Sequence, residues 1–562
     1  MRIAPAAALL AVLLITSCGA PASTGPNPSA NNQAQQGPKK ISIGMRGEAK
    51  TISAKLNSAA GAGGTPGVAE TERILNAGLT VIDKPKGLHA QLAEAIPSVE
   101  NGLWNVFPDG TMTTTWHLRE GIVWHDDVPF TADDLLFTNQ VSQDKDLPIL
   151  RDVSFQYIKS VTAPDPRTVT ISWSEPFIQA DAMFNSDHAL PMPRHLLEKT
   201  YLDDKASLPN LSYWSRDFVG TGAFKMQDWV SGSYLILTAN DHYALGRPKI
   251  DEIQVKFLPD PSAMAAAILA DQVDVTEGGR LALDWGVALR DQWRSGQMVI
   301  DPPTSAIGAW PQFLNPSPAV LLDPQFRRAL LYGVDRNELV ESLIFGLGPR
   351  YDSTVNPRDP EFSEVESSII RYEFDPRRAA QIIEGLGYAR GPDSLYHDAG
   401  GQVLSLESRT QVTDDQQVKT QLYLANSWQQ QGVKIEQVTF PEQQAQDREY
   451  RATRPGLEVT RQPQGWAELR RFYGPNTPLP ANSYTGVNRT RHQNPEFDAL
   501  IDTLFTTVPH APRMDVLRQI VHYMTDQVII LGMFYDAAPA MIANRLQAPN
   551  GDVYNVHEWD VR

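Results

Sequence analysis

The sequence predicts an α/β protein built from several domains. Segments with the period of strands alternate along the chain with segments that carry helix periodicity and capping signals, and no short repeat occurs. The chain has 562 residues, of which 42% are apolar and 20% charged; it is globular in composition and too long for one core. Asp and Glu outnumber Lys and Arg by 66 to 49, and the net charge of −17 argues against a nucleic-acid partner.

The chain starts with a segment that resembles a secretion signal. Arg2 supplies a positive charge, and the apolar run 6–15 is shorter than the about 20 residues that a permanent membrane helix needs. It ends in the residues 15–18, Ile-Thr-Ser-Cys, which resemble the lipobox of a bacterial lipoprotein. We therefore predict a signal peptide over 1–17 and lipidation of Cys18, with an ordinary signal peptide and a chance cysteine as the alternative.

Cys18 is the only cysteine, so the chain can form no internal disulfide and no cysteine metal site. Residues 18–40 are rich in Pro, Gly, Ser, Asn and Gln and predict a flexible tether. No later stretch is long and apolar enough to span a membrane. The sequence thus predicts a protein held by lipid on the outer face of a bacterial cell membrane, in a periplasm or at the cell surface.

Strands and helices follow in order along the rest of the chain. Apolar and polar residues alternate as in half-buried strands over 112–119, 168–173, 234–238 and 253–257, and a further strand is predicted over 433–438. Helices are predicted after the capping residues Thr131, Asp323, Asp335 and Asp375, and over 413–431 and 513–525. Thr131 with Asp134, and Asp335 with Glu338, have the spacing of a capping box.

No motif of a nucleophilic enzyme, a phosphate-binding loop, a dinucleotide site or a zinc protease occurs. His117 and His125 share one hairpin and are interpreted as structural, because no further ligand residues accompany them. The pairs Asp126-Asp127 and Asp414-Asp415 are interpreted as turn or surface features. A secreted hydrolase that uses a carboxylate pair stays open as the alternative from another functional class, and no cofactor or metal is predicted.

Six segments, in order and over nearly the whole chain after the tether, resemble the family 5 extracellular solute-binding proteins, the dipeptide-, oligopeptide- and nickel-binding components of ABC importers. The segments are 115–137 with its Trp-His-Asp hairpin, 219–225 (Val-Gly-Thr-Gly-Ala-Phe-Lys), 260–274, 323–336, 374–387 and 494–500 (Asn-Pro-Glu-Phe-Asp-Ala-Leu). Each segment is weak evidence alone, and the six are mostly scaffold, with none an obvious ligand contact, so they identify the fold and leave the ligand open.

The resemblance implies a two-lobed periplasmic-binding-protein fold of type II, from the large three-domain cluster, with an interlobe ligand cleft and a hinge. It places the main domain of lobe I at 41–75, 215–300 and 525–562, an extra domain of lobe I at 76–214, and lobe II at 301–524. Hinge closure would trap the solute, and the closed monomer would dock on a membrane permease. No covalent chemistry is needed.

The resemblance also suggests ligand contacts in the stretch 465–472. Trp466 is the predicted principal contact, with Arg470 or Arg471 for polar recognition. Peptide binders of the family often carry here an Asp that pairs with the peptide's amine; this chain has none, and Glu468 is the candidate substitute. The alternative is that Trp466 is core and that both arginines are solvated.

Four further contacts are predicted. Arg409 follows a predicted strand, roughly where dipeptide binders hold a carboxylate, Trp310 lies at the crossing into lobe II, and Gly64 and Thr65 would offer backbone contacts from lobe I. The predicted solute is peptide-like, with an oligosaccharide as the second choice and nickel or haem as the third. A sensor that has kept the fold without a transporter is the remaining hypothesis.

Overall fold

A computed structural model describes residues 37–48, 51–58, 67–83, 87–147, 153–277, 281–445, 447–548 and 553–562. The chain divides into two units, Met1–Gly37 and Pro38–Arg562, and all elements below belong to the second. The signal peptide, most of the tether, Cys18, Gly64 and Thr65 lie outside the described residues, so the predictions made for them stay predictions. No helix of the described residues is long and apolar enough to cross a membrane.

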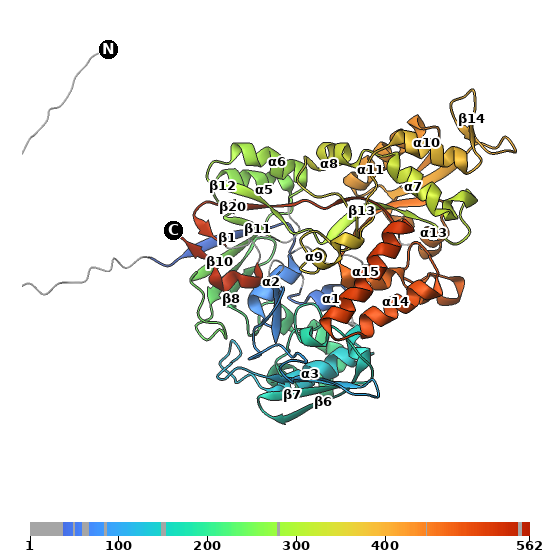
Figure 1. The fold of residues 1–562 in the computed structure, drawn as a ribbon. Helices are drawn as coiled ribbons and strands as arrows, with labels where there is room; N and C mark the ends of the chain where they lie inside the picture. The colour runs from blue at the N-terminus through green and yellow to red at the C-terminus, as the bar shows by residue number, and fades with distance from the viewer. Residues whose placement is uncertain are drawn as a thin grey trace, which may run out of the picture. The chain divides into compact units, whose positions relative to one another are not determined.

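A seven-stranded sheet forms the centre of the first half of the fold (Figure 1), which we call lobe I. Its strand order is β12-β20-β11-β1-β10-β9-β8, and β1 is parallel to both of its neighbours. α5 (Pro261–Leu269) and α6 (Leu283–Gln292) pack over β12 and β20 around a small apolar core. The strands are β1 (Lys40–Met45), β8 (Phe224–Val230), β9 (Tyr234–Ala239), β10 (Glu252–Phe257), β11 (Val275–Glu277), β12 (Gly296–Asp301) and β20 (Ala538–Ala543).

A five-stranded sheet forms the centre of the second half, which we call lobe II. Its order is β17-β16-β18-β13-β19, and β16 runs parallel to β17 and β18. α7 (Pro324–Tyr332), α8 (Arg336–Ile344), α10 (Pro376–Gly385) and α11 (Asp415–Gln430) share an apolar core with this sheet. The strands are β13 (Ser305–Pro311), β16 (Ser405–Gln411), β17 (Lys434–Phe440), β18 (Leu457–Pro463) and β19 (Leu531–Tyr535).

Two chain crossings join the sheets. Residues 302–304 lead from β12 to β13, and residues 536–537 lead from β19 back to β20. The crossings are adjacent, because the Asp536 N–H donates to the Ser305 carbonyl at 3.0 Å. The return into the first sheet thus follows Tyr535 rather than residue 525, since β19 pairs with β13.

A four-stranded sheet with the order β4-β5-β7-β6 lies in the sequence interval predicted for an extra domain, between β3 and β8. Every second residue of β5 and β7 is buried, as their alternation predicts. In Figure 1 this sheet and α3 form the cyan part of the fold. The elements are β4 (Trp104–Val106), β5 (Met112–His117), β6 (Ile158–Asp165), β7 (Thr168–Trp173), α3 (Ala132–Gln143) and α4 (Arg194–Asp203).

The shorter elements and the C-terminal helices complete the fold. α14 and α15 pack against each other and are drawn in orange and red in Figure 1. These elements are α1 (Ala54–Ser58), α2 (Val68–Leu75), β2 (Thr80–Asp83), β3 (Gly87–Ala90), α9 (Phe362–Val365), β14 (Ala389–Arg390), β15 (Tyr396–His397), α12 (Glu442–Ala445), α13 (Arg448–Ala452), α14 (Pro495–Thr506), α15 (His510–Asp526), β21 (Leu546–Gln547) and β22 (Asp560–Val561).

The helix starts follow the predicted caps, with one difference. Thr131 and Asp134 form the predicted capping box of α3. The Asp335 carboxylate accepts hydrogen bonds from the first turn of α8, but Glu338 does not complete a box. The Glu338 carboxylate instead accepts a hydrogen bond from the Tyr423 hydroxyl at 2.8 Å, because α11 packs beside α8.

The Gly-Thr-Gly turn at 220–222 is specified by close packing. A Cβ atom on Gly222 would lie 2.4 Å from the Leu75 carbonyl carbon, and one on Gly220 would lie 2.0 Å from the Leu75 oxygen. The His125 ring clamps the turn: its Nδ1 accepts from the Gly220 N–H at 3.2 Å, and its Nε2 lies 3.1 Å from the Gly222 carbonyl. Burial lowers the pKa of His125 to about 4. This confirms His125 as a structural residue.

Candidate functional site

One row of side chains crosses the lobe II sheet and contains two of the predicted contacts. Arg409 of β16 is paired in register with Glu458 of β18, which is paired with Trp310 of β13. Residues that are directly opposite point to the same face of a sheet. Arg409, Glu458 and Trp310 therefore share one face, which the segments 448–454 and 466–492 contact.

Arg409 is already paired within its own strand. Its guanidinium forms an ion pair with Glu407, lies 4.5 Å from the ring centroid of Tyr450, and donates to the Tyr450 carbonyl at 3.2 Å. The predicted role of Arg409 as a carboxylate ligand stays a prediction, and it requires the solute to compete with Glu407.

Trp310 is 1% exposed. Its ring stacks on Phe472, with 5.3 Å between the ring centroids, and its Nε1 donates to no atom of the described residues. Phe472 ends the stretch that was predicted to bind the solute, so two predicted contact regions meet at this stack. Trp310 thus lines that region as a buried side chain and does not offer an exposed ring for stacking.

The predicted contact stretch forms a short 3-10 helix, Trp466–Phe472. Trp466 is partly buried, with its ring centroid 6.2 Å from that of Phe505 in α14, and the Arg513 guanidinium lies 5.9 Å from its centroid. Arg470 lies 4.4 Å from the centroid of the Phe505 ring. The stretch is therefore fixed against α14 and α15 by aromatic and cation–π contacts.

Glu468 and Arg471 neutralise each other. They form an ion pair across one turn, and their side chains are 36% and 29% exposed. Glu468 is thus not a free carboxylate for a ligand amine, although exposure lets the pair rearrange at little cost. Its predicted role as the substitute anchor is untested.

A second acidic residue, from the extra domain, interacts electrostatically with a residue of this region. Asp181 lies in the short helix Ala180–Ala182, and burial raises its pKa to about 6, while the nearby charges of Arg513 and His188 oppose that rise. Arg513 belongs to α15 of lobe II and is the same residue that lies over Trp466. A carboxylate of lobe I is thus within electrostatic reach of Arg513, which contacts Trp466.

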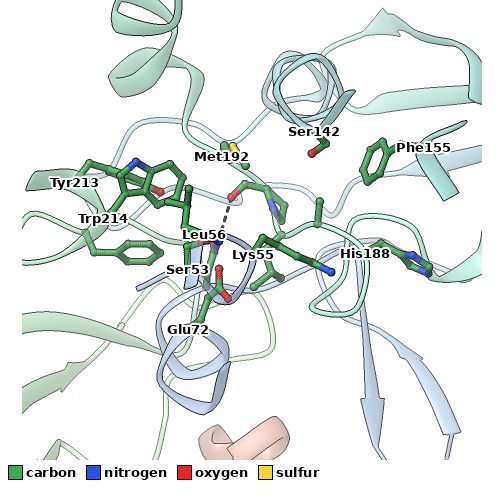
Figure 2. Close-up of a pocket in the computed structure, with 15 residues that line it drawn as sticks. Ser53, Lys55, Leu56, Glu72, Ser142, Phe155, His188, Met192, Tyr213 and Trp214 are labelled. Carbon is green, nitrogen blue, oxygen red and sulfur yellow. Dashed lines mark hydrogen bonds between the residues drawn. The ribbon is translucent and has the colours of Figure 1, made fainter. Parts of the chain in front are cut away.

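A small pocket lies where the extra domain meets α1 and α2 (Figure 2). Figure 2 shows Glu72 beside Ser53, with Tyr213 and Trp214 on one side of the pocket and His188 on the other. Its volume of about 30 Å³ fits roughly two water molecules and no solute. Burial raises the pKa of Glu72 to about 7. The pocket is thus an internal feature of lobe I.

The two aspartate pairs are engaged in structural contacts, as predicted. Within the described residues, no group of three or more His, Cys, Asp and Glu side chains forms a metal site. The Asp126 and Asp127 carboxylates are hydrogen-bonded to the rings of His195 and His242, and Asp414 and Asp415 form ion pairs with Arg461 and Lys419.

Comparison with known proteins identifies the family. The model for "Bacterial extracellular solute-binding proteins, family 5 Middle" matches residues 89–477. The chain belongs to this family. Its members are solute-binding proteins of ABC transporters and not enzymes, and the fold is their two-lobed α/β fold.

Individual relatives are distant. The oligopeptide-binding protein AppA of Bacillus subtilis is 25% identical over 406 residues, which are 72% of this chain and 69% of AppA. The dipeptide-binding protein of Escherichia coli is 25% identical over 315 residues, 53% of this chain and 56% of its own length. This chain spans about half of the length, 51%, of other curated relatives that it matches.

Solved structures share the fold. AppA of Bacillus subtilis in complex with a nonapeptide has a TM-score of 0.67 at 19% identity, with 93% of this chain and 100% of AppA covered. NikZ from Campylobacter jejuni in complex with Ni(L-His) has a TM-score of 0.69 at 20% identity, with 93% and 99% covered. At these identities the likeness concerns the fold alone.

Sequence reasoning missed Glu458 and the arginines around it. The signal was present: a glutamate interrupts the apolar start of β18, and four arginines occur between Arg448 and Arg461 in a chain that is acidic overall. Asp181 was missed because its neighbour Arg513 is remote in sequence, so only the fold brings them together.

Proposed function

We propose that the protein is the receptor of an ABC importer, which captures a small peptide-like solute between its two lobes and delivers it to a membrane permease. The observation that carries the proposal is the match to the solute-binding family over most of the folded chain, together with two sheets joined by two adjacent crossings. Such crossings act as a hinge when a ligand that contacts both lobes favours the closed form.

Peptides are the leading solute class. AppA was solved with a nonapeptide and the Escherichia coli relative is a dipeptide-binding protein, which supports this choice. NikZ was solved with Ni(L-His), so a metal chelate belongs in any ligand screen. Oligosaccharides are the third class to test; no contact in the described residues favours them over peptides.

The proposed lobe boundaries follow the sheets. Lobe I would comprise 41–75, 215–301 and 538–562 with the extra domain 76–214, and lobe II would comprise 305–535. The contacts proposed for the solute are Trp466 and Arg470 from lobe II and Asp181 from the extra domain, because Arg513 links the surroundings of Trp466 and Asp181.

The proposed anchor is a lipid on Cys18. Residues 15–18 resemble a lipobox, and a diacylglycerol supplies the two chains that firm membrane attachment needs. The Cys18→Ser protein is expected in the soluble fraction after cell breakage, and the unchanged chain in the membrane fraction. Equal membrane retention of both proteins contradicts the anchor and leaves the binding function untouched.

A ligand screen tests the binding function. A solute that binds only the native protein at 100 times its dissociation constant stabilises it by about 2.7 kcal/mol, which for a chain this long is a rise of a few degrees at most in melting temperature. Peptides, oligosaccharides and nickel–histidine are the probes, and at least one peptide is expected to stabilise the protein and to be recovered chemically unchanged. Recovery of hydrolysed peptide would contradict the proposal.

A further inference from the structure

Three guanidinium groups converge on one buried carboxylate in lobe II. Glu458 of β18 is 2% exposed. Arg451 of α13 forms an ion pair with its Oε1, Arg489 lies 3.4 Å from the same oxygen, and Arg454 lies 3.7 Å from Oε2. One negative charge thus lies near three positive charges and can balance only one of them.

Arg491 adds a fourth positive charge to this cluster. It is 7% exposed, donates to the Ala452 carbonyl at 3.1 Å, and lies close enough to Arg454 to disfavour its charge. No ion pair joins Arg491 to a carboxylate within the described residues. The four arginines and Glu458 therefore carry a net charge of 4 − 1 = +3 in a protein whose total charge is −17.

The cluster also has more hydrogen-bond donors than acceptors. The Nε atoms of Arg451, Arg454 and Arg491 and the Nε1 of Trp310 are buried and donate to no atom of the described residues. One acceptor, Glu458 Oε2, has no hydrogen bond. Buried charges and donors without partners are costly, so this surplus indicates that an acceptor with negative charge completes the cluster. Burial lowers the pKa of Arg454 to about 10, in keeping with this imbalance.

The cluster adjoins the region proposed to bind the solute. Trp310 is the cross-strand neighbour of Glu458, on the same face of the sheet, and its ring stacks on Phe472 at the end of the Trp466–Phe472 helix. Trp310 thus connects the Trp466–Phe472 helix with the arginines around Glu458. Arg489 and Arg451 keep side-chain exposures of 30% and 18%, whereas that of Arg454 is 1%.

We propose that the transported solute is acidic and that Arg451 and Arg489 bind an oxyanion that it carries, a carboxylate or a phosphate. Arg454 and Arg491 position the cluster through backbone carbonyls and add to its positive potential. The proposal rests on the proposed function, which it narrows to a solute class.

Calorimetric titration of the purified full chain with matched probes tests the proposal. The probes are triglutamate, trialanine and trilysine, the last two with amidated C-termini so that neither carries a carboxylate, and sodium phosphate, all at constant ionic strength. Triglutamate is expected to bind at least about tenfold more tightly than trialanine, and trilysine more weakly than both, since hydrogen bonds between charged groups are the strong ones. If phosphate binds more tightly than triglutamate, the oxyanion is a phosphate. If triglutamate binds more tightly, the oxyanion is a carboxylate. Both results support the proposal.

Variants assign the effect to the cluster. Arg489→Gln and Arg451→Gln are expected to remove most of the preference for triglutamate over trialanine. Arg377→Gln, an exposed arginine of α10, is the control and is expected to behave as the unchanged chain. An unchanged preference in both cluster variants, or equal affinities for triglutamate and trialanine together with no binding of phosphate, overturns the proposal.

The compounds released from natively purified protein separate the two hypotheses. An acidic compound found by mass spectrometry supports both. A neutral or cationic compound contradicts the acidic solute and leaves the receptor function standing. If no compound is released and no probe of either screen binds, both the receptor function and the acidic solute are contradicted.

Discussion

Glu458→Gln is the perturbation that most directly tests the electrostatic account of lobe II. The side chain lies in β18, at the centre of the five-stranded sheet, and is 2% exposed. Its carboxylate is in ion-pair range of Arg451, Arg454 and Arg489. The glutamine keeps the shape and one oxygen acceptor, so the change removes charge and little packing.

The expected loss of stability follows from the arginine charges that remain buried after the substitution. Removing one partner of a buried ion pair typically costs about 3–5 kcal/mol, because the remaining charge stays buried without compensation. Here the remaining charges are several, but Arg489 and Arg451 are 30% and 18% exposed and turn to solvent at low cost. The loss therefore comes mainly from Arg454, whose side chain is 1% exposed, and we expect about 3 kcal/mol.

Thermal and urea unfolding followed by tryptophan fluorescence measure this loss. Trp310 and Trp428, two of the twelve tryptophans, are buried in lobe II, so that lobe contributes to the signal. The matched control is Glu436→Gln, an exposed glutamate that pairs with Lys434 at the edge strand β17, with an expected change below about 1 kcal/mol. If both variants lose the same small stability, the cluster is solvated and the account of a buried charge surplus is wrong.

Three further predictions concern the Trp466–Phe472 helix and the Gly-Thr-Gly turn. Trp466→Ala is expected to weaken solute binding by roughly 1–3 kcal/mol, with only a small fall in the melting temperature of the unliganded protein; a large fall with normal affinity in the same titrations would show that Trp466 is scaffold. Gly222→Ala is expected to cost about 3 kcal/mol in urea unfolding, because its Cβ meets backbone atoms of α2, whereas Gly385→Ala in α10, with open space around the Cβ, is expected to be neutral or stabilising. Because burial lowers the pKa of His125 to about 4, the unfolded chain binds more protons than the folded one between that value and 6.5, so stability falls as the pH drops through this window; His125→Gln is expected to flatten the dependence, and an unaltered profile contradicts the assignment.

The sequence predicted much of the fold because its signals are local. Alternation places β5 and β7 in one half-buried sheet, and the capping residues Thr131 and Asp375 mark where α3 and α10 begin. The predicted helix 413–431 is found as α11, since its end at Gly432 follows from the backbone rather than from tertiary packing. Such features need no knowledge of distant contacts.

The lobe boundary at residue 525 was a weaker prediction for the opposite reason. A helix ends at Asp526 and a strand begins at Leu531, but the sequence of this segment does not show which sheet the strand joins. Only the pairing of β19 with β13 assigns it to lobe II. Strand order is a long-range property, and periodicity carries no information about it.

The candidate site shows the same division between local and distant information. The resemblance predicts Trp310, Arg409 and Trp466 as contacts from their positions along the chain, but the sequence does not show which neighbours in space these side chains already contact. Glu407 lies two residues from Arg409 in the same strand, so its partnership was within reach of sequence reasoning.

The surroundings of Glu458 were only partly within reach: Arg451 and Arg454 are close to it in sequence, whereas Arg489 meets it only in the fold. The local charge balance is a sum over all side chains that meet in one place, and it can be worked out only when the fold is known.

The net charge beside Trp310 is positive although the chain is acidic. A receptor that must release its solute to a permease gains from this arrangement. Guanidinium groups that stay partly exposed hold an acidic solute by contacts that water can replace when the lobes open. A buried ion pair with the solute would hold it more firmly and release it more slowly. The exposures of Arg451 and Arg489 therefore fit reversible capture, whereas the buried Arg454 holds the backbone of the strands in place.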